Sequence, residues 1–495
     1  MTSGAAVRGV TGYFLAALVV VFTWAVGVPR FASPDEPAHI YKAYATAHGH
    51  LLGKAAPGFP DNLREFDGPA SIGPPDLGCY VGQPDVPAGC EGLGKPPLIS
   101  SAARYPPWYY ALVGLPVVAT GQSERVVAYR FVSAVFCAAL LALAMLLTKR
   151  SRRSDLAALQ VAAATPMALF LMASVNPNAI EIAVFVAMWA CLARVATDAE
   201  LPRRVLILAS FLAASVVLMR PISIVWVAGM VAVVLIAMTA TRRRQLYSWR
   251  TFAWVAGPTA GALVVSWIWA VYAKFEVKDD RLTNSLSLGA ALRRSVNNWS
   301  GYFRQTIGVL GWLDTVMPSF VYAIWIVVLI TIAVVHVRGA MPRRLVAFAA
   351  LIVVWLALPL LINGFTNSRA GLTYQGRYSL PIFVGVAFLP LWNERPSLRR
   401  SQVVQRWLVV AVVALVIVAE VGAFWQTLRR FTVGAHGKIV LTGPLPWEPS
   451  IAPMGLIVMN ALAMLAVAWS ALRSWGQVEA AAGEGNGEGP EHGAD

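Results

Sequence analysis

The stretch VTGYFLAALVVVFTWAVGVPRFASPDEPAHIYKAY occupies residues 10–44 and joins two different kinds of sequence. Residues 10–29 are predominantly apolar and long enough to cross a bilayer as one helix. Residues 33–44 then bring two acids, a histidine and a lysine close together. A membrane-crossing helix followed at once by such a segment predicts a membrane protein with reactive groups at the membrane surface.

The apolar pattern of residues 10–29 recurs along the whole chain. The 495 residues are 58% hydrophobic and only 13% charged, whereas a soluble domain carries about 25% charged residues. This composition excludes a soluble enzyme, a disordered protein and a nucleic-acid-binding domain. We expect an all-α polytopic bundle with about twelve spans. The predicted spans lie at about 10–29, 125–148, 155–173, 179–197, 204–219, 222–240, 251–273, 318–337, 345–362, 374–392, 407–425 and 452–472.

The basic residues orient the spans. The formal net charge is +15, and the charges gather in short loops such as KRSRR (149–153) and RRR (242–244). Such clusters favour the cytoplasmic side, which gives a multi-pass protein of the bacterial cytoplasmic (inner) membrane with both termini cytoplasmic. Residues 104–121 are apolar but short and rich in proline. We interpret them as an interfacial or re-entrant helix, because a span there would reverse every later loop.

The chain then divides into one transmembrane domain and a tail. The domain covers residues 1–475, with a long first exoplasmic loop at 30–124 and a second at 274–317. Residues 476–495 hold five acids and neither Lys nor Arg, and we expect a disordered cytoplasmic tail. Cys79 and Cys90 share the first loop, where an oxidising compartment would let them form a disulfide.

The segment SPDEPAHIYKAY (33–44) predicts a helix on the membrane surface. Ser33 or Asp35 can cap it, and an apolar stripe follows at helical spacing. Asp35, His39 and Lys42 share another face, with Glu36 beside Asp35. Two carboxylates beside a histidine can supply a general base or hold a divalent metal. The alternative is that Asp35 only caps the helix and that the other groups form a solvated face.

The long first loop with its acidic motif resembles the GT-C superfamily of membrane glycosyltransferases. The motifs resemble more closely a bacterial family named domain of unknown function 2142. They are PDEPAHIYKAY (34–44), YPPWYYAL (105–112), SVNPNAIEIA (174–183), GWLDTVMP (311–318) and QGRYSLPI (375–382). The sequence departs from related enzymes at Tyr105, where a His or Lys often precedes the two prolines, and at Asn178, where the nearest acid is Glu181.

The resemblance implies a sugar transfer at the extracytoplasmic face. The donor would be a polyprenyl-phosphate sugar, and the acceptor an envelope glycan or glycolipid. Asp35 would be the base of an inverting reaction, with Glu36 assisting, and arginines would stabilise the departing lipid phosphate. A divalent metal (Mg, Mn or Ca) on Asp35, Glu36 and His39 is a further expectation. The expected substrate-binding residues are His39, Lys42, Glu181, Arg220, Trp312, Asp314 and Arg377.

Two other classes of function fit the same chain. A transporter or flippase of lipid-linked glycans would place its functional charges inside the spans. A non-catalytic scaffold of an envelope-synthesis complex would tolerate loss of the Asp35 carboxylate. The scarcity of ionisable residues in the predicted spans favours the enzyme.

Overall fold

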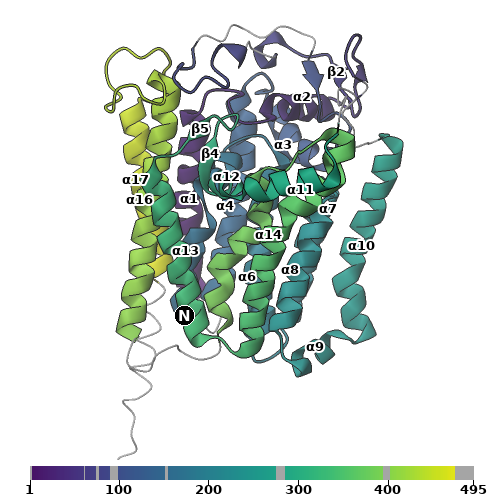
Figure 1. The fold of residues 1–495 in the computed structure, drawn as a ribbon, viewed down its shortest axis with the longest axis vertical. Helices are drawn as coiled ribbons and strands as arrows, with labels where there is room; N and C mark the ends of the chain where they lie inside the picture. The colour runs from purple at the N-terminus through teal and green to yellow at the C-terminus, as the bar shows by residue number, and fades with distance from the viewer. Residues whose placement is uncertain are drawn as a thin grey trace, which may run out of the picture.

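The computed structural model describes residues 3–60, 62–73, 77–89, 98–150, 154–274, 285–393 and 402–473. These residues form a bundle of long helices that is covered at one end by short helices and small sheets (Figure 1). Eight of the described helices are long and apolar enough to cross a membrane. They are α1 (Ser3–Gly27), α4 (Val126–Lys149), α6 (Pro177–Thr197), α10 (Trp249–Tyr272), α13 (Ser319–Gly339), α14 (Pro342–Ala370), α16 (Gln402–Val433) and α17 (Pro453–Leu472).

The four other predicted spans correspond to shorter or interrupted helical segments. Two are the single helices α7 (Arg203–Met219) and α8 (Ser223–Ala237). The other two are broken at prolines, which cannot donate the helical backbone hydrogen bond. They comprise η3 (Ser154–Ala163) with α5 (Pro166–Met172), and η4 (Gly376–Ser379) with α15 (Leu380–Phe383) and η5 (Val384–Trp392). The polytopic helical class is therefore confirmed, and the count of twelve stays a prediction.

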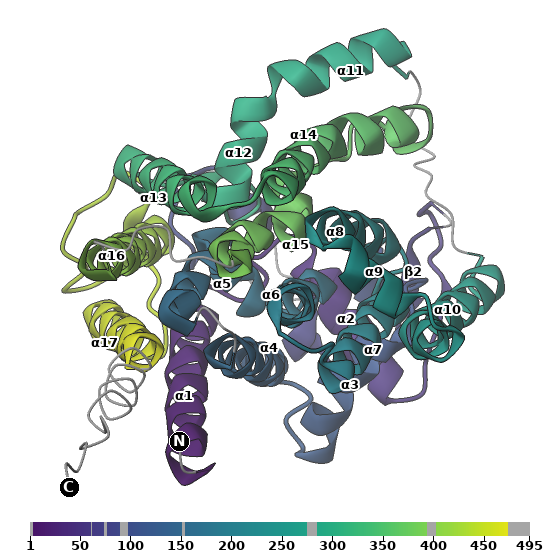
Figure 2. The same ribbon diagram turned by 90° about the horizontal axis from the view of Figure 1, so that it is seen from below.

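Helix α6 lies in the middle of the bundle. Seen along the bundle axis, it is surrounded by α4, α5, α15, α8 and α7 (Figure 2). Nearly all of its side chains are buried. A helix that is apolar on every side is stable in such a position. The outer helices α10 and α14 instead bury only 11% and 22% of the residues in their apolar windows, as expected where lipid covers them.

The first loop folds into a cap over one end of the bundle. Helix α2 (Glu36–Ala47) starts where the sequence predicts. It packs against α3 (Pro107–Ala119), where a Cβ on Gly114 would lie 2.4 Å from the Ala43 carbonyl oxygen. A three-stranded antiparallel sheet completes the cap, with η1 (Ala70–Ile72) and η2 (Leu77–Cys79) beside it. Its strands are β1 (Lys54–Ala55), β2 (Arg64–Phe66) and β3 (Leu98–Ser100), in the order β1-β2-β3.

The cap bears on two expectations about this loop, and the length of α3 favours the interfacial interpretation of residues 104–121. Helix α3 has 13 residues, fewer than the ~20 that a span needs. The polar face of α2 is not solvated, because Glu36, His39 and Lys42 are all buried beneath the cap. The periodicity of one helix cannot reveal a second layer that covers it.

The second loop adds elements at the same end of the bundle. They are α11 (Leu288–Asn297), α12 (Trp299–Gly308) and the hairpin strands β4 (Val309–Leu310) and β5 (Thr315–Val316). The arginine-bearing α9 (Ala240–Leu246) lies at the opposite end, with the N-terminus (Figure 1). The acidic first loop and the 242–244 cluster therefore lie at opposite ends of the bundle.

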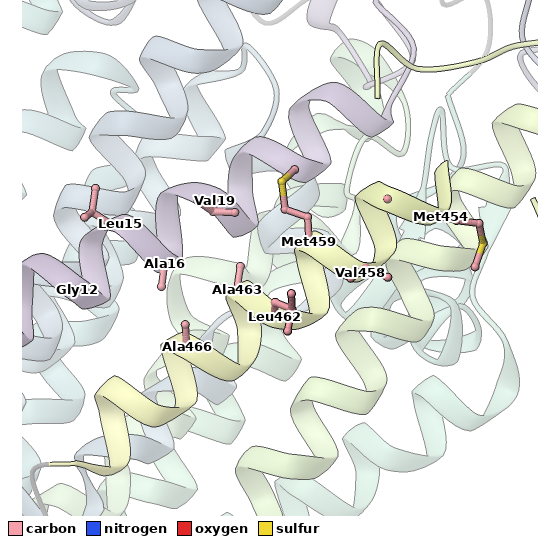
Figure 3. Close-up of a pocket in the computed structure, with 11 residues that line it drawn as sticks. Gly12, Leu15, Ala16, Val19, Met454, Val458, Met459, Leu462, Ala463 and Ala466 are labelled. Atoms are coloured by element: carbon pink, nitrogen blue, oxygen red, sulfur yellow. The ribbon is translucent and has the colours of Figure 1, made fainter. Parts of the chain in front are cut away.

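An apolar groove of about 850 Å³ runs between α1 and α17. Figure 3 shows the lining residues of both helices, with Ala16 of α1 pointing toward Ala463 and Ala466 of α17. None of the predicted site residues lines it, so the candidate site has to be sought at the capped end.

Candidate active site around Asp35

Asp35 stands at the start of α2 with its backbone in the left-handed region, at φ 64°. It occupies the N-cap position, but its side chain accepts no capping hydrogen bond. Its Oδ2 instead accepts a hydrogen bond of 2.8 Å from Nη2 of Arg377. The Asp35 side chain is 47% exposed, whereas that of Arg377 is 2% exposed. The Asp35 side chain therefore does not cap its own helix, and its carboxylate has a buried cation on one side and solvent on the other.

Arg377 is held in place by the packing of η4 against α12. A Cβ on Gly376 would lie 2.1 Å from the Tyr302 carbonyl oxygen, so only glycine permits this approach. The Gly376 amide donates to Oε1 of Gln305 at 2.8 Å, and Thr306 Oγ1 donates to the Gly376 carbonyl at 3.0 Å. The 274–317 loop, through α12, thereby fixes the arginine that contacts the first loop.

Two other nitrogen atoms of Arg377 do not bond to Asp35. Nε and Nη1 are buried and make no hydrogen bond of good geometry within the described part of the chain. The guanidinium carbon lies 5.4 Å from the centre of the Tyr378 ring. A buried guanidinium is suited to bind a phosphate or carboxylate group through parallel hydrogen bonds.

Arg220 reaches the same tyrosine from another direction. It follows α7 directly, and its guanidinium carbon lies 5.9 Å from the centre of the Tyr378 ring. Its Nη1 donates to Oε2 of Glu181, whose Oε1 accepts from Ser223 Oγ at 2.5 Å. The structure therefore brings both predicted arginines around one ring and pairs the predicted Glu181 with one of them.

His39 lies within the same group of side chains. Its Nδ1 is 2.9 Å from the hydroxyl oxygen of Tyr110, and the two rings are stacked. Burial lowers the pKa of His39 to about 4; Asp35 opposes this shift, and Arg377 and Arg220 add to it. His39 is therefore neutral at pH 7 and acts as a hydrogen-bonding group rather than as a cation.

Glu36 turns away from this group into a buried ion pair with Arg130 of α4. Arg130 donates from Nε to Oε1 at 2.8 Å and from Nη2 to Oε2 at 2.6 Å. The backbone amides of Phe31 and Val175 donate to the same carboxylate, each at 3.1 Å. These bonds occupy both oxygens of Glu36. The assisting role of Glu36 stays a prediction, and its contacts favour a positioning role.

Arg130 also binds the end of α1, and sequence reasoning missed it. Its guanidinium donates to the carbonyls of Ala25, Val28 and Pro29 at 2.7 to 2.8 Å. The sequence did contain a signal for Arg130. It is a lone arginine near one end of the predicted span at 125–148, where a charge is costly unless it is paired. Tyr110, Ser223 and Tyr378 were missed as well, because nothing local distinguishes them from other interfacial residues.

Lys42 is fully buried, and among the described residues its side chain donates to backbone carbonyls of the cap rather than to Asp35. Its Nζ donates to the carbonyl of Ala103 at 2.7 Å and to that of Leu51. The ring centres of Phe66, Tyr110 and Trp269 lie 5.6 to 6.0 Å away. Burial lowers the pKa of Lys42 to about 7. Lys42 therefore joins parts of the cap to one another.

Trp312 and Asp314 also hold the cap together. Trp312 Nε1 donates to the Phe31 carbonyl at 3.0 Å, beside the turn that leads to Asp35. Oδ2 of Asp314 accepts from the Gly82 amide at 3.0 Å and from Arg430 Nη2 at 3.1 Å. Cys79, in the same part of the loop, is disulfide-bonded, while its predicted partner Cys90 and the tail at 476–495 lie outside the described residues.

The expected metal ligands do not converge. Within the described residues, no group of three His, Cys, Asp or Glu side chains is arranged to hold a metal ion. Asp35 is paired with Arg377, and Glu36 with Arg130. The side chains of Asp35, Glu36 and His39 therefore do not fit a divalent metal as a set.

These features define a polytopic membrane protein whose capped end holds the Asp35–Arg377 pair, with a second arginine, Arg220, near the same tyrosine ring. The chain belongs to the family described as predicted membrane protein (DUF2142), whose model matches residues 18–386. This match confirms the family that the motifs indicated.

Two solved structures are similar at 12% sequence identity. ArnT from Cupriavidus metallidurans in the apo state has a TM-score of 0.47, over 93% of this chain and 76% of that chain. ArnT bound to undecaprenyl phosphate has a TM-score of 0.46, over 99% of this chain and 82% of that chain. A search of curated proteins gave no match.

Proposed function

We propose that this protein transfers a sugar from a polyprenyl-phosphate donor to an envelope glycan or glycolipid. The observation that carries the proposal is the half-exposed Asp35 carboxylate beside Arg377, which is buried and has unused donors. A carboxylate that water and substrate can reach can accept a proton. A desolvated arginine can stabilise an anionic leaving group. Both are needed when a hydroxyl displaces a lipid phosphate.

In the proposed step, the acceptor hydroxyl oxygen attacks the anomeric carbon. Its proton passes to Asp35, whose Oδ1 makes no hydrogen bond to the described residues. The bond between the anomeric carbon and the phosphate oxygen breaks on the opposite face, which inverts the configuration. The phosphate leaves with the bonding electron pair and carries the added negative charge.

Arg377 and Arg220 stabilise this charge in the proposal. Arg377 offers Nε and Nη1, while the side chain of Arg220 is 18% exposed despite its bond to Glu181. Because His39 is neutral, the positive charge at this site comes from the two arginines. In the proposal, His39 orients the substrate through hydrogen bonds. Trp312 and Asp314 border the acceptor side in this proposal.

The Arg130–Glu36 pair positions Asp35. It joins α4, the end of α1, the start of α2 and the Val175 amide before α6. Phe31 and Asp35 adopt left-handed backbone conformations at φ 66° and 64° within this short connection. Such conformations persist only where surrounding contacts hold them. Glu36 therefore serves the reaction by fixing its neighbour.

The proposed orientation places the cap outside the bacterial inner membrane and α9 in the cytoplasm. It rests on the positive-inside rule and on the position of the 242–244 arginines at the end opposite the cap. Both termini then lie in the cytoplasm. The partners are the lipid-linked donor, the envelope acceptor and the bilayer, without nucleic acid.

The decisive test compares envelope glycans after deletion of the gene. The deletion strain receives the wild type, Asp35→Asn or Asp67→Asn, an exposed acid of the same cap. We expect mass spectrometry to show one sugar missing from the deletion and Asp35→Asn strains and present in the other two. Equal membrane levels of the three proteins serve as the control. A full glycan profile with Asp35→Asn would refute the base assignment.

A transporter or flippase of lipid-linked glycans is the second candidate, and Glu420 favours it. This residue lies within α16 and is fully buried, and neither of its carboxyl oxygens has a hydrogen-bond partner within the described chain. Ionisable groups inside the membrane are costly and commonly functional. If Glu420→Gln abolishes the glycan product while Asp35→Asn does not, the transporter replaces the enzyme.

A further inference from the structure

Helix α11 lies across the bundle axis at the capped end and projects beyond α14 at the edge of the molecule (Figures 1 and 2). One face is fixed to α14. Gly364 of α14 packs against two leucines of α11, since a Cβ atom on it would lie 3.7 Å from the Leu288 side chain and 3.8 Å from that of Leu292. Asn363 Nδ2 also donates to Ser295 Oγ at 2.9 Å. The helix therefore has a defined inner face and an outer face without a partner in the described chain.

The outer face carries two adjacent arginines around a shallow hollow. The hollow has a volume of about 490 Å³. Its lining residues, here called the α11 surface, are Ser287, Gly289, Ala290, Arg293, Arg294 and Asn297. Arg293 and Arg294 are exposed, and residues 285–313 contain no acid. Gly289 and Ala290 leave room for a group between the charged side chains.

The neighbouring part of α14 indicates at which level of the bilayer the α11 surface lies. Leu361 and Phe365 are 64% and 59% exposed on either side of Gly364, as expected for lipid-facing positions. One turn further, Arg369 lies over the Phe365 ring, with its guanidinium carbon 4.3 Å from the ring centre. An exposed apolar surface that gives way to arginine and aromatic groups is typical of the boundary between hydrocarbon and headgroups.

Helix α11 itself has the composition of a helix lying in that boundary. Leu288 and Val296 are 58% and 47% exposed beside the two arginines. Exposed apolar side chains favour contact with acyl chains, and guanidinium groups bind phosphate with two parallel hydrogen bonds. A ligand that offers both contacts together is a phospholipid.

We propose that the α11 surface binds the phosphate groups of anionic phospholipids in the leaflet on the capped side. The absence of acids from residues 285–313 gives this surface one sign of charge, which complements an anionic leaflet. The site is separate from Asp35 and does not depend on sugar transfer. Helix α12 follows α11 and packs on η4, which carries Arg377. The bound lipid would therefore hold η4 at a fixed depth relative to the membrane surface.

The test uses the full-length protein in lipid nanodiscs with an environment-sensitive fluorophore on Val296→Cys. We expect the emission to shift as phosphatidylglycerol replaces phosphatidylcholine. In Arg293→Gln/Arg294→Gln, the phosphatidylglycerol concentration needed for the shift should rise at least about ten-fold. The matched control is Arg203→Gln/Arg204→Gln, an exposed arginine pair at the start of α7, which should respond as the wild type does.

Three results would overturn the proposal. The first is an equal response from the α11 variant and the wild type. The second is a full shift in phosphatidylcholine alone, which would show that charge is not recognised. The third is full competition by millimolar inorganic phosphate, which would indicate a free-anion site. None of these fluorescence measurements requires catalytic activity. The lipid test therefore remains valid if the proposed sugar transfer proves wrong.

Discussion

Nη2 of Arg377 lies 2.8 Å from Oδ2 of Asp35, although 342 positions separate the two residues in the chain. The arginine is almost completely buried and the aspartate is half exposed. The pair therefore fixes the buried side of the carboxylate and leaves its other side accessible. This contact links the first loop to η4.

Arg377→Lys should lower transfer from a polyprenyl-phosphate donor by about 100-fold or more, because one ammonium cannot replace several aligned guanidinium donors. Initial rates with purified protein and a short-chain donor measure this effect. Arg369→Gln, an exposed arginine on α14, should retain the wild-type rate. Equal rates for Arg377→Lys and the wild type would remove Arg377 from the phosphate site.

Asp35→Asn should abolish transfer while lowering the melting temperature less than loss of either member of the fully buried Arg130–Glu36 pair does, because Asp35 is half exposed. Asparagine tolerates the left-handed backbone, and its amide oxygen can still accept from Arg377. Asp35 also makes no capping bond, so the loss of about 1 kcal/mol that follows removal of an N-cap should not occur. Thermal unfolding measured in parallel with activity separates the two effects. A large drop in melting temperature would mean that the carboxylate mainly supports the fold.

Arg130→Met or Glu36→Leu alone should destabilise the protein by about 3–5 kcal/mol, because each leaves an unpaired buried charge. The double variant should recover much of that loss. Asp67→Asn, which breaks an exposed pair with Lys54, should cost less than about 1 kcal/mol. Unfolding in detergent provides the comparison. Additive losses in the double variant would contradict the idea that the two side chains act as a pair.

Lys42 should make stability rise with pH in the alkaline range. Burial lowers its pKa to about 7 in the folded protein, against about 10.4 in an unfolded chain. Between these values the unfolded state binds the extra proton, so the free energy of unfolding increases by on the order of 1 kcal/mol per pH unit. Melting curves of the wild type and Lys42→Met from pH 7 to 10 should diverge in favour of the wild type. Parallel curves would show that Lys42 titrates normally.

Transfer should persist in excess EDTA, because Asp35 and Glu36 are each paired with an arginine and do not converge with His39. The assay compares untreated enzyme, chelated enzyme and chelated enzyme resupplied with Mg²⁺ or Mn²⁺. Activity that disappears with the chelator and returns with either ion would assign the site a metal.

The sequence determined the class of protein and part of the site. An apolar run of about 20 residues has few stable alternatives to a membrane helix, because its unpaired backbone groups must be satisfied internally. The same reasoning singled out Arg220 and Arg377, since charges beside apolar segments need a partner or a function. It also predicted the start of α2 from Pro37 and the acids before it.

The tertiary structure alone decided what those residues contact. Asp35 accepts a hydrogen bond from Arg377, which is distant in the chain, and Glu36 forms an ion pair with Arg130. Lys42 donates to the backbone carbonyl of Ala103 in the cap. Helical spacing places Asp35, His39 and Lys42 on one face, but it cannot show that the cap divides this face into separate environments. Local pattern fixes which way a side chain points along its own helix, whereas its partner and its access to water depend on segments that pack there from elsewhere in the chain.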